Sequence, residues 1–414
     1  MPQACTGFPL PPELIFDIFQ WAVCLPGILS IFDSYFPAAE CQFIRMSPQA
    51  KEARATMLAI VLVCRKWNVI ARALVLHHID ISKRAQLEGL LEVLKHASAE
   101  DRCRAKRLDI RGKEICFGTP EPLKPLMELI ALLPDLEFLS IEERFAVKKQ
   151  EHESFVAHIV HHLPNLKRFH CRNVSTPGEP IHNATPGYLV LPGLQWFTGV
   201  WSASLTTVLE APPLTSTSIT ILTLQFLLGG DLPIQGLRFP ALRRLGAEGL
   251  SGSHTGLLQF LDIHGPQLVS LGLSYNIIDP SQLEQEILVR CTSLRELIRG
   301  ASAGIMQSTQ QTYPAIRSFG TACGVFFTPM LSKGMINKSH LLNRFPKLSV
   351  VRVLDVSYES PPTGWSMRMV EDLLHPRGNL TFEDAYGTSI PESRNTGMCL
   401  PSAVTESILT HGSH

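Results

Sequence analysis

Apolar residues recur along most of the chain in a fixed unit. Each unit has an aliphatic residue, two residues of any kind, then Leu, Phe or Val, and often a further apolar residue two positions on. In seven units a proline stands two positions before the first aliphatic residue. The series begins its units at residues 105, 136, 166, 194, 219, 242, 268, 294, 316 and 348. Steps of 22 to 32 residues predict stacked copies of one module, each with a short strand.

Amphipathic stretches lie between these predicted strands. Their apolar spacing predicts helices over residues 122–133, 154–163, 256–263, 280–289 and 338–345. Each unit has one apolar edge that it cannot bury alone, so stacked units would form one continuous core and a curved solenoid. The clearest copy, Leu268-x-x-Leu271-x-Leu273-x-x-Asn276, resembles a leucine-rich repeat, although most other units lack the Asn. The resemblance implies an α/β horseshoe with parallel strands on its concave face.

Within each predicted strand, the residues that alternate with the apolar ones are expected on the concave surface. Polar, charged and aromatic groups there are suited to recognising another protein. For any single residue, a merely solvated side chain is the competing interpretation. The target-binding set predicted in this way is Glu142, Arg168, His170, Arg172, Trp196, Gln225, Arg244 and Glu248, and the same phase places Ser140, Thr198, Thr223, Ser270 and Ser274 beside them.

The first eighty residues have a helical period instead. Pro11 and Pro12 stand where proline is tolerated, at a helix entrance, and Glu13 follows in the first turn, where the helix dipole favours a carboxylate. Apolar residues then recur at helical spacing to Phe19. A second helical run is predicted from Pro48, with Ser47 as its N-cap, through residue 74, and residues 77–81 are a candidate first strand.

Two segments of this head resemble an F-box of the kind common in fungi. They are Leu10-Pro-Pro-Glu-Leu14 and Leu62-Val-Cys-Arg-Lys-Trp67, followed by Ala71, Leu74 and His78-Ile-Asp-Ile81. The resemblance implies a helical module that binds a Skp1-like adaptor and, through it, a cullin ligase core. The connection is longer than a compact F-box allows, so the insertion at residues 22–46 must loop out. The adaptor-binding set implied is Leu10, Pro11, Leu14, Ile18, Phe19, Val63, Cys64 and Trp67, with core packing as the alternative for Leu14 and Trp67.

These patterns divide the chain into three parts. Residues 1–82 form the helical head, residues 83–359 the repeat solenoid, and residues 360–414 a cap or flexible tail in which periodicity is lost. The tail is rich in Gly, Ser, Thr, Pro and Asn.

Composition limits the classes of partner. Lys and Arg total 37, as do Asp and Glu, so no global field points to nucleic acid or to an anionic membrane. Hydrophobic residues make up 45% of the chain, enough for a continuous core. The ten cysteines are scattered without a C-x-x-C pair, which suits a reducing compartment. A cytoplasmic or nuclear protein is therefore expected.

No catalytic constellation is found in the sequence. Gly249-Leu-Ser-Gly-Ser253 ends in Ser where a nucleophile elbow needs Gly. His158 and His162 have metal-ligand spacing on a helix but lack the Glu of a His-Glu-x-x-His site. We therefore expect no enzyme activity, cofactor or metal. The predicted function is a substrate-recognition subunit of an SCF-type (Skp1–cullin–F-box) ubiquitin ligase, and the alternative is an interaction scaffold without ligase association.

Overall fold

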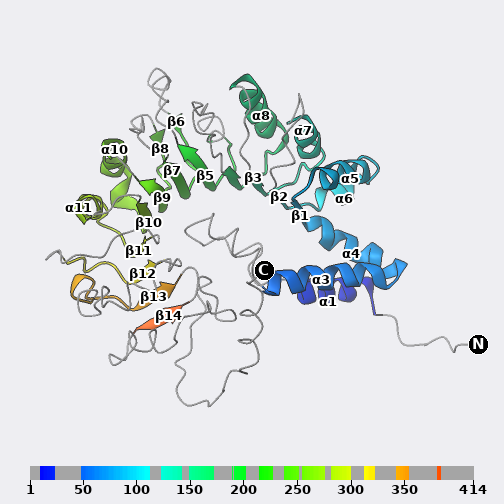
Figure 1. Cartoon of the computed structure of the whole chain (residues 1–414), viewed down its shortest axis with the longest axis horizontal. Coiled ribbons are helices and arrows are strands. Elements are labelled where there is room, and N and C mark those ends of the chain that lie inside the picture. The colour runs from blue at the N-terminus through cyan, green and yellow to red at the C-terminus, as the bar shows by residue number, and fades with distance from the viewer. Residues whose placement is uncertain are drawn as a thin grey trace, which may run out of the picture.

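The computed structural model describes thirteen parts of the chain and shows an arc of strands with helices outside it (Figure 1). The described parts are residues 10–23, 48–111, 123–141, 149–171, 189, 191–201, 214–226, 237–250, 254–275, 281–299, 312–321, 342–353 and 380–383.

One parallel sheet of twelve strands runs through the described part of the molecule. Its strands, in spatial order, are β1 (His78–Ile81), β2 (Arg107–Ile110), β3 (Phe138–Ile141), β4 (Arg168–Cys171), β5 (Trp196–Trp201), β7 (Ile221–Phe226), β9 (Arg244–Leu250), β10 (Ser270–Tyr275), β11 (Glu296–Arg299), β12 (Ser318–Thr321), β13 (Val350–Val353) and β14 (Thr381–Glu383). Every pair is parallel and adjacent copies are aligned, as in Leu139 opposite Phe169 and Leu245 opposite Leu271. This is the arrangement of a leucine-rich-repeat solenoid, so the predicted fold class is confirmed.

Each of the ten repeat units leads into one of these strands. The first apolar position of every unit is buried, from Ala105 at 0% exposure to Leu348 at 7%. The next apolar position, in the strand itself, joins the same core, so successive turns bury one another's edges. A two-stranded sheet of β6 (Leu214–Thr215) and β8 (Leu237–Arg238) was not predicted.

Helices cover the outer side of the arc (Figure 1). They are α5 (Arg84–Lys95), α6 (Ala99–Cys103), α7 (Lys124–Ala131), α8 (Lys149–His162), α10 (Thr255–His264) with the short 3-10 helix η4 (Gly265–Gln267), and α11 (Ser281–Arg290). Helices α7, α8, α10 and α11 fall on four of the predicted helical stretches. Of the fifth, only residues 342–345 lie in the described part, and residues 342–344 are helical.

The head consists of α1 (Pro12–Val23), α3 (Pro48–Val63) and α4 (Arg65–His77) in the described residues. The sequence predicted an unbroken helical run through residue 74, and this was wrong at Cys64. The backbone of Cys64 is extended, and its Sγ accepts a hydrogen bond from the Trp67 N–H at 3.5 Å, so Cys64 is the N-cap of α4. The predicted insertion at 22–46 lies almost wholly outside the described residues.

The sheet extends beyond the predicted repeat series at both ends. Strand β1 follows α4 without a linker and pairs with β2, and Leu76 of α4 belongs to the solenoid core. At the other end, β14 pairs with β13 inside the segment predicted as cap or tail. The candidate first strand at residues 77–81 is thus confirmed as β1, whereas β14, with Phe382 between Thr381 and Glu383, was not predicted.

A buried ion triad inside the solenoid was also not predicted. Arg299, on the core side of β11, lies 3.0 Å from the Glu284 carboxylate of α11, and Arg344 lies 3.5 Å from the same carboxylate. All three residues are at most 6% exposed. The repeat period predicts an apolar residue at position 299, where the chain has arginine. The structure shows that Glu284 of the outer helix α11 supplies the opposite charge.

The concave side of the arc is crowded at Gly246 in β9. A Cβ added there would lie 2.9 Å from the Thr223 Cγ2 atom of the neighbouring strand. We expect Gly246→Ala to lower the free energy of unfolding by about 1–3 kcal/mol through overpacking. Gly89→Ala in α5 meets nothing within 4 Å and should raise stability by up to about 1 kcal/mol. Denaturant unfolding measures the free energy of unfolding of both variants. Equal changes in the two would contradict the crowding at Gly246.

Candidate interaction surfaces

The three helices of the head share a small core of their own. Ile15 and Phe19 of α1 pack with Ile60 of α3 and Ala71 of α4, each at most 9% exposed. The partly buried ring of Trp67 meets Phe19 edge to face, with ring centroids 4.8 Å apart. Helices α1 and α3 are thus held on α4, which continues into the sheet.

Seven large apolar side chains of the head point away from that core. Each is at least 49% exposed. They are Leu10, just before α1, and Leu14, Ile18, Leu58, Leu62, Val63 and Val69 within the helices. We call these seven the apolar head surface. Four of them, Leu10, Leu14, Ile18 and Val63, were predicted as adaptor contacts; the other three were missed although they continue the same helical period. Pro11, also predicted, is exposed at the start of α1.

Three members of the predicted adaptor set have structural contacts within the head. Phe19 is only 4% exposed, with Trp67 packed against it, so it supports the head from inside and is not on the accessible surface as predicted. Trp67 is partly buried in the same core. Cys64 is exposed, and its thiol caps α4.

The thiols offer a direct check of this arrangement. Burial raises the pKa of Cys171 and of Cys291 to about 12, whereas Cys64 is exposed. We expect iodoacetamide to modify Cys64 in the folded protein roughly ten-fold or more faster than Cys171 or Cys291. Peptide mapping by mass spectrometry measures the three rates, and equal rates would rule out the described burial.

The concave face differs from the prediction that its side chains are open to solvent. His170 is 4% exposed and Trp196 is 5% exposed. Ser140, Thr198, Thr223 and Ser270 are also buried. The strands converge on this side of the arc, so neighbouring side chains cover one another.

Contacts among the larger side chains account for much of this burial. The Arg107 guanidinium lies 4.3 Å from the centroid of the Phe138 ring, and that of Arg168 lies 5.8 Å from the Trp196 ring. The Trp196 indole N–H donates a hydrogen bond to the Thr198 hydroxyl at 3.1 Å. Trp196 therefore helps to build the face and is not an open hot spot.

The other predicted concave residues fall into two groups. Arg168, Arg244 and Glu248 are partly buried on β4 and β9 and keep some accessible surface. Glu142 and Arg172 lie outside the described residues, as do the side chains of Gln225 and Ser274. Arg168, Arg244 and Glu248 therefore lie on the concave face, as predicted, but are only partly accessible.

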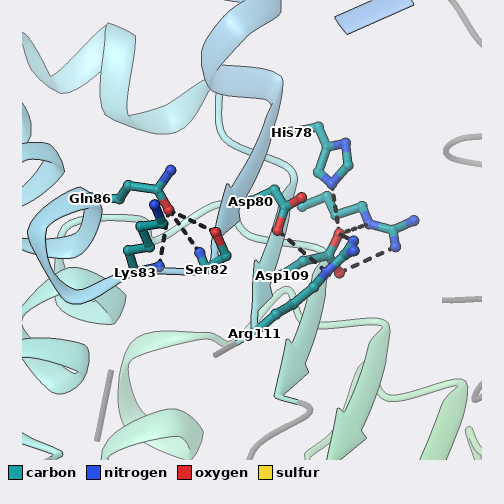
Figure 2. Close-up of polar contacts among 8 residues, drawn as sticks. His78, Asp80, Ser82, Lys83, Gln86, Asp109 and Arg111 are labelled. Atoms are coloured by element: carbon teal, nitrogen blue, oxygen red, sulfur yellow. Dashed lines mark hydrogen bonds and ion pairs between the residues drawn. The ribbon is translucent and has the colours of Figure 1, made fainter. Parts of the chain in front are cut away.

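A cluster of charged side chains joins the head to the solenoid (Figure 2). The buried Asp109 carboxylate on β2 lies 2.8 Å from Arg107 and 3.3 Å from Arg111, and Arg111 also lies 3.3 Å from Asp80. His78, the first residue of β1, lies 2.6 Å from Asp109. Burial alone would raise the pKa of Asp109, but Arg107, His78 and Arg111 hold it well below its usual range.

Gln86 of α5 closes the turn next to this cluster (Figure 2). Its side-chain oxygen accepts hydrogen bonds from the backbone N–H groups of Ser82 and Lys83, at 2.9 and 3.1 Å. These bonds satisfy donors that the start of α5 would otherwise leave exposed, and so fix the chain where it leaves β1.

The remaining candidates for chemistry have structural contacts. His158 donates a hydrogen bond from Nε2 to the Met127 carbonyl of α7 at 2.7 Å, and its ring lies 4.2 Å from that of His162. Within the described residues, no three His, Cys, Asp or Glu side chains are grouped to hold a metal ion. Gly249 has a φ of 75°, beside a register shift between β9 and β10. None of the described helices is both long and apolar enough to span a membrane.

Comparisons with known proteins give distant structural matches only. No protein-family model matches the chain, and a search of curated proteins finds no match. Among solved structures, the chain is similar to a chain of the yeast Rad7–Elc1 complex, with 13% identity, a TM-score of 0.41, and coverage of 90% of this chain and 92% of that one. It is also similar to an internalin of Listeria monocytogenes, with 12% identity, a TM-score of 0.30, and coverage of 72% and 93%.

Proposed function

We propose that this protein is a non-catalytic substrate receptor of an SCF-type ubiquitin ligase. In this proposal the head binds a Skp1-like adaptor of the cullin core, and the repeat solenoid binds a target protein. Recruitment raises the effective concentration of the target at the ligase, so the receptor itself needs no catalytic group. The proposal places the protein in the cytoplasm or nucleus.

The apolar head surface is the observation that carries the proposal. The described core of the head is formed without the seven exposed apolar side chains. Apolar side chains on a preformed helix face provide the anchors that a groove on a partner can bury. Leu10, Leu14, Leu62 and Val63 of this surface also belong to the two segments that resemble an F-box.

The alternative function, a scaffold without ligase association, is favoured by a different contact. Leu76 of α4 is buried in the solenoid core, so the head also caps the first strand of the sheet. Capping explains why α4 packs against the sheet. It does not explain why Leu14 and Ile18 of α1 are exposed. We therefore place the ligase receptor first.

Binding of the intact chain to a purified Skp1-like adaptor tests the proposal. We expect a one-to-one complex that survives size-exclusion chromatography. Absence of binding by a folded preparation would remove the ligase function and leave the scaffold. A hydrolase screen provides a separate check on the proposal that the chain is not an enzyme.

A further inference from the structure

A line of backbone hydrogen bonds follows the edge where the strands begin. Along it, each residue donates its N–H to the carbonyl of the corresponding residue one repeat earlier. In the later repeats the line passes from Arg243 to Val269, Arg295, Arg317 and Ser349, with N–O distances of 2.8 to 2.9 Å. These positions are therefore held in one row, about 4.8 Å apart.

Cations dominate this later part of the row. Arg243, Arg295 and Arg317 are exposed, and none forms an ion pair with a described residue. Arg243 donates one hydrogen bond to the Gln267 carbonyl at 3.3 Å. We call these three arginines the cation row. Arg295 and Arg317 are direct neighbours on adjacent strands, and like charges so placed destabilise a sheet.

The earlier part of the same row is neutralised within the protein. Glu137 stands between Lys106 and Lys167, and its carboxylate lies 3.7 Å and 2.7 Å from their ammonium groups. The later positions of the row, from Arg243 to Ser349, are all described, and none of them is an acid. Glu296, the nearest acid in sequence, is one residue further on and partly buried, and it accepts a hydrogen bond from the Ser318 hydroxyl at 3.5 Å.

We propose that the cation row binds an extended acidic segment of the target protein, whose carboxylates supply the missing counter-charges. Exposed arginines that start from one backbone row can meet the side chains of one extended strand, and Arg can hold a carboxylate with two hydrogen bonds. This inference rests on the proposed function, because it specifies the chemistry of the target.

Two other polyanions are left to the test. A single-stranded nucleic acid would bind through its phosphates and by stacking its bases on aromatic rings. An anionic bilayer would attract the same cations by charge. Tighter binding of either one than of oligoglutamate, with vesicles of an anionic lipid as the bilayer probe, would overturn the inference.

Fluorescence anisotropy with the full chain and labelled oligoglutamate tests the inference. We expect binding at low salt that weakens as salt rises, and no binding of oligoglutamine of equal length. The triple variant Arg243→Gln, Arg295→Gln, Arg317→Gln should bind oligoglutamate roughly ten-fold more weakly. Replacing the same three residues by lysine should retain most of the affinity, because the charge remains.

The control variant Arg84→Gln, Lys95→Gln, Arg104→Gln removes the same number of cations from the outer side of the arc. Lys95 is exposed and Arg84 and Arg104 are partly buried, and each of the three forms an ion pair with a glutamate. The control variant should bind oligoglutamate like the wild type. Equal losses in both glutamine variants, or no loss in either, would overturn the inference, as would tighter binding of an oligothymidylate of equal length. Adaptor binding is measured on the same preparations. Oligoglutamate binding without adaptor binding would contradict the ligase function alone.

Discussion

Replacing both Leu14 and Ile18 by aspartate is expected to abolish adaptor binding while the head stays folded. Both side chains are about half exposed and lie outside the core formed by Ile15 and Phe19. Charged groups at these positions would have to be desolvated in the complex. We expect the affinity for a Skp1-like adaptor to fall by more than about 100-fold, measured by titration calorimetry.

The control is the same chemical change at exposed apolar residues of the outer helices. Val93 of α5 and Ile263 of α10 are 58% and 41% exposed. Replacing both by aspartate should leave adaptor affinity within a factor of about three. If this control lost as much affinity as the head variant, or the head variant lost none, the apolar head surface would not be the binding site.

Asp109→Asn is expected to destabilise the solenoid by about 3–5 kcal/mol at neutral pH. The substitution leaves the guanidinium groups of Arg107 and Arg111, 1% and 8% exposed as residues, without their shared carboxylate. Denaturant unfolding followed by circular dichroism measures the change. The matched control is Asp262→Asn, which removes the exposed partner of Arg290 and should change stability by less than about 1 kcal/mol.

Asp109 also makes the stability of the solenoid depend on pH. The pKa of Asp109 is lower in the folded state than in the unfolded chain, where it is about 3.9. The contribution of Asp109 to the free energy of unfolding is therefore fully present above pH ~4. It is lost as the pH falls toward the pKa of the folded state. Asp109→Asn should not show this loss of stability below pH ~4. If the two proteins showed parallel stability curves below pH ~4, the charge cluster would not have this role.

The solenoid could be predicted from the sequence because the same few positions are buried in every repeat. Residues such as Leu136, Leu166 and Leu268 are each 0% exposed, and their spacing alone identifies the strands. The candidate strand at residues 77–81 was confirmed as β1, but β14 was not predicted. Strand β14 has one apolar residue, Phe382, between Thr381 and Glu383, and no proline-led unit precedes it.

The interaction surfaces were predicted less well, because alternation assigns a side chain to a face but not to solvent. His170 and Trp196 do stand on the concave side, yet curvature and neighbouring side chains bury them. Helical spacing likewise groups Leu14 with Phe19, although the first is half exposed and the second is covered by Trp67. The cation row needed the register of the sheet, since Arg243, Arg295 and Arg317 are far apart in sequence.

Hydrogen–deuterium exchange of the full chain, with and without a purified Skp1-like adaptor, tests the central claim most directly. The claim is that the apolar head surface binds the adaptor while the solenoid stays free for a target. It predicts slower exchange on binding in residues 10–19 and 55–69, and unchanged exchange in strands β9 to β12. Unchanged exchange in the head, or slower exchange confined to the solenoid, would contradict it.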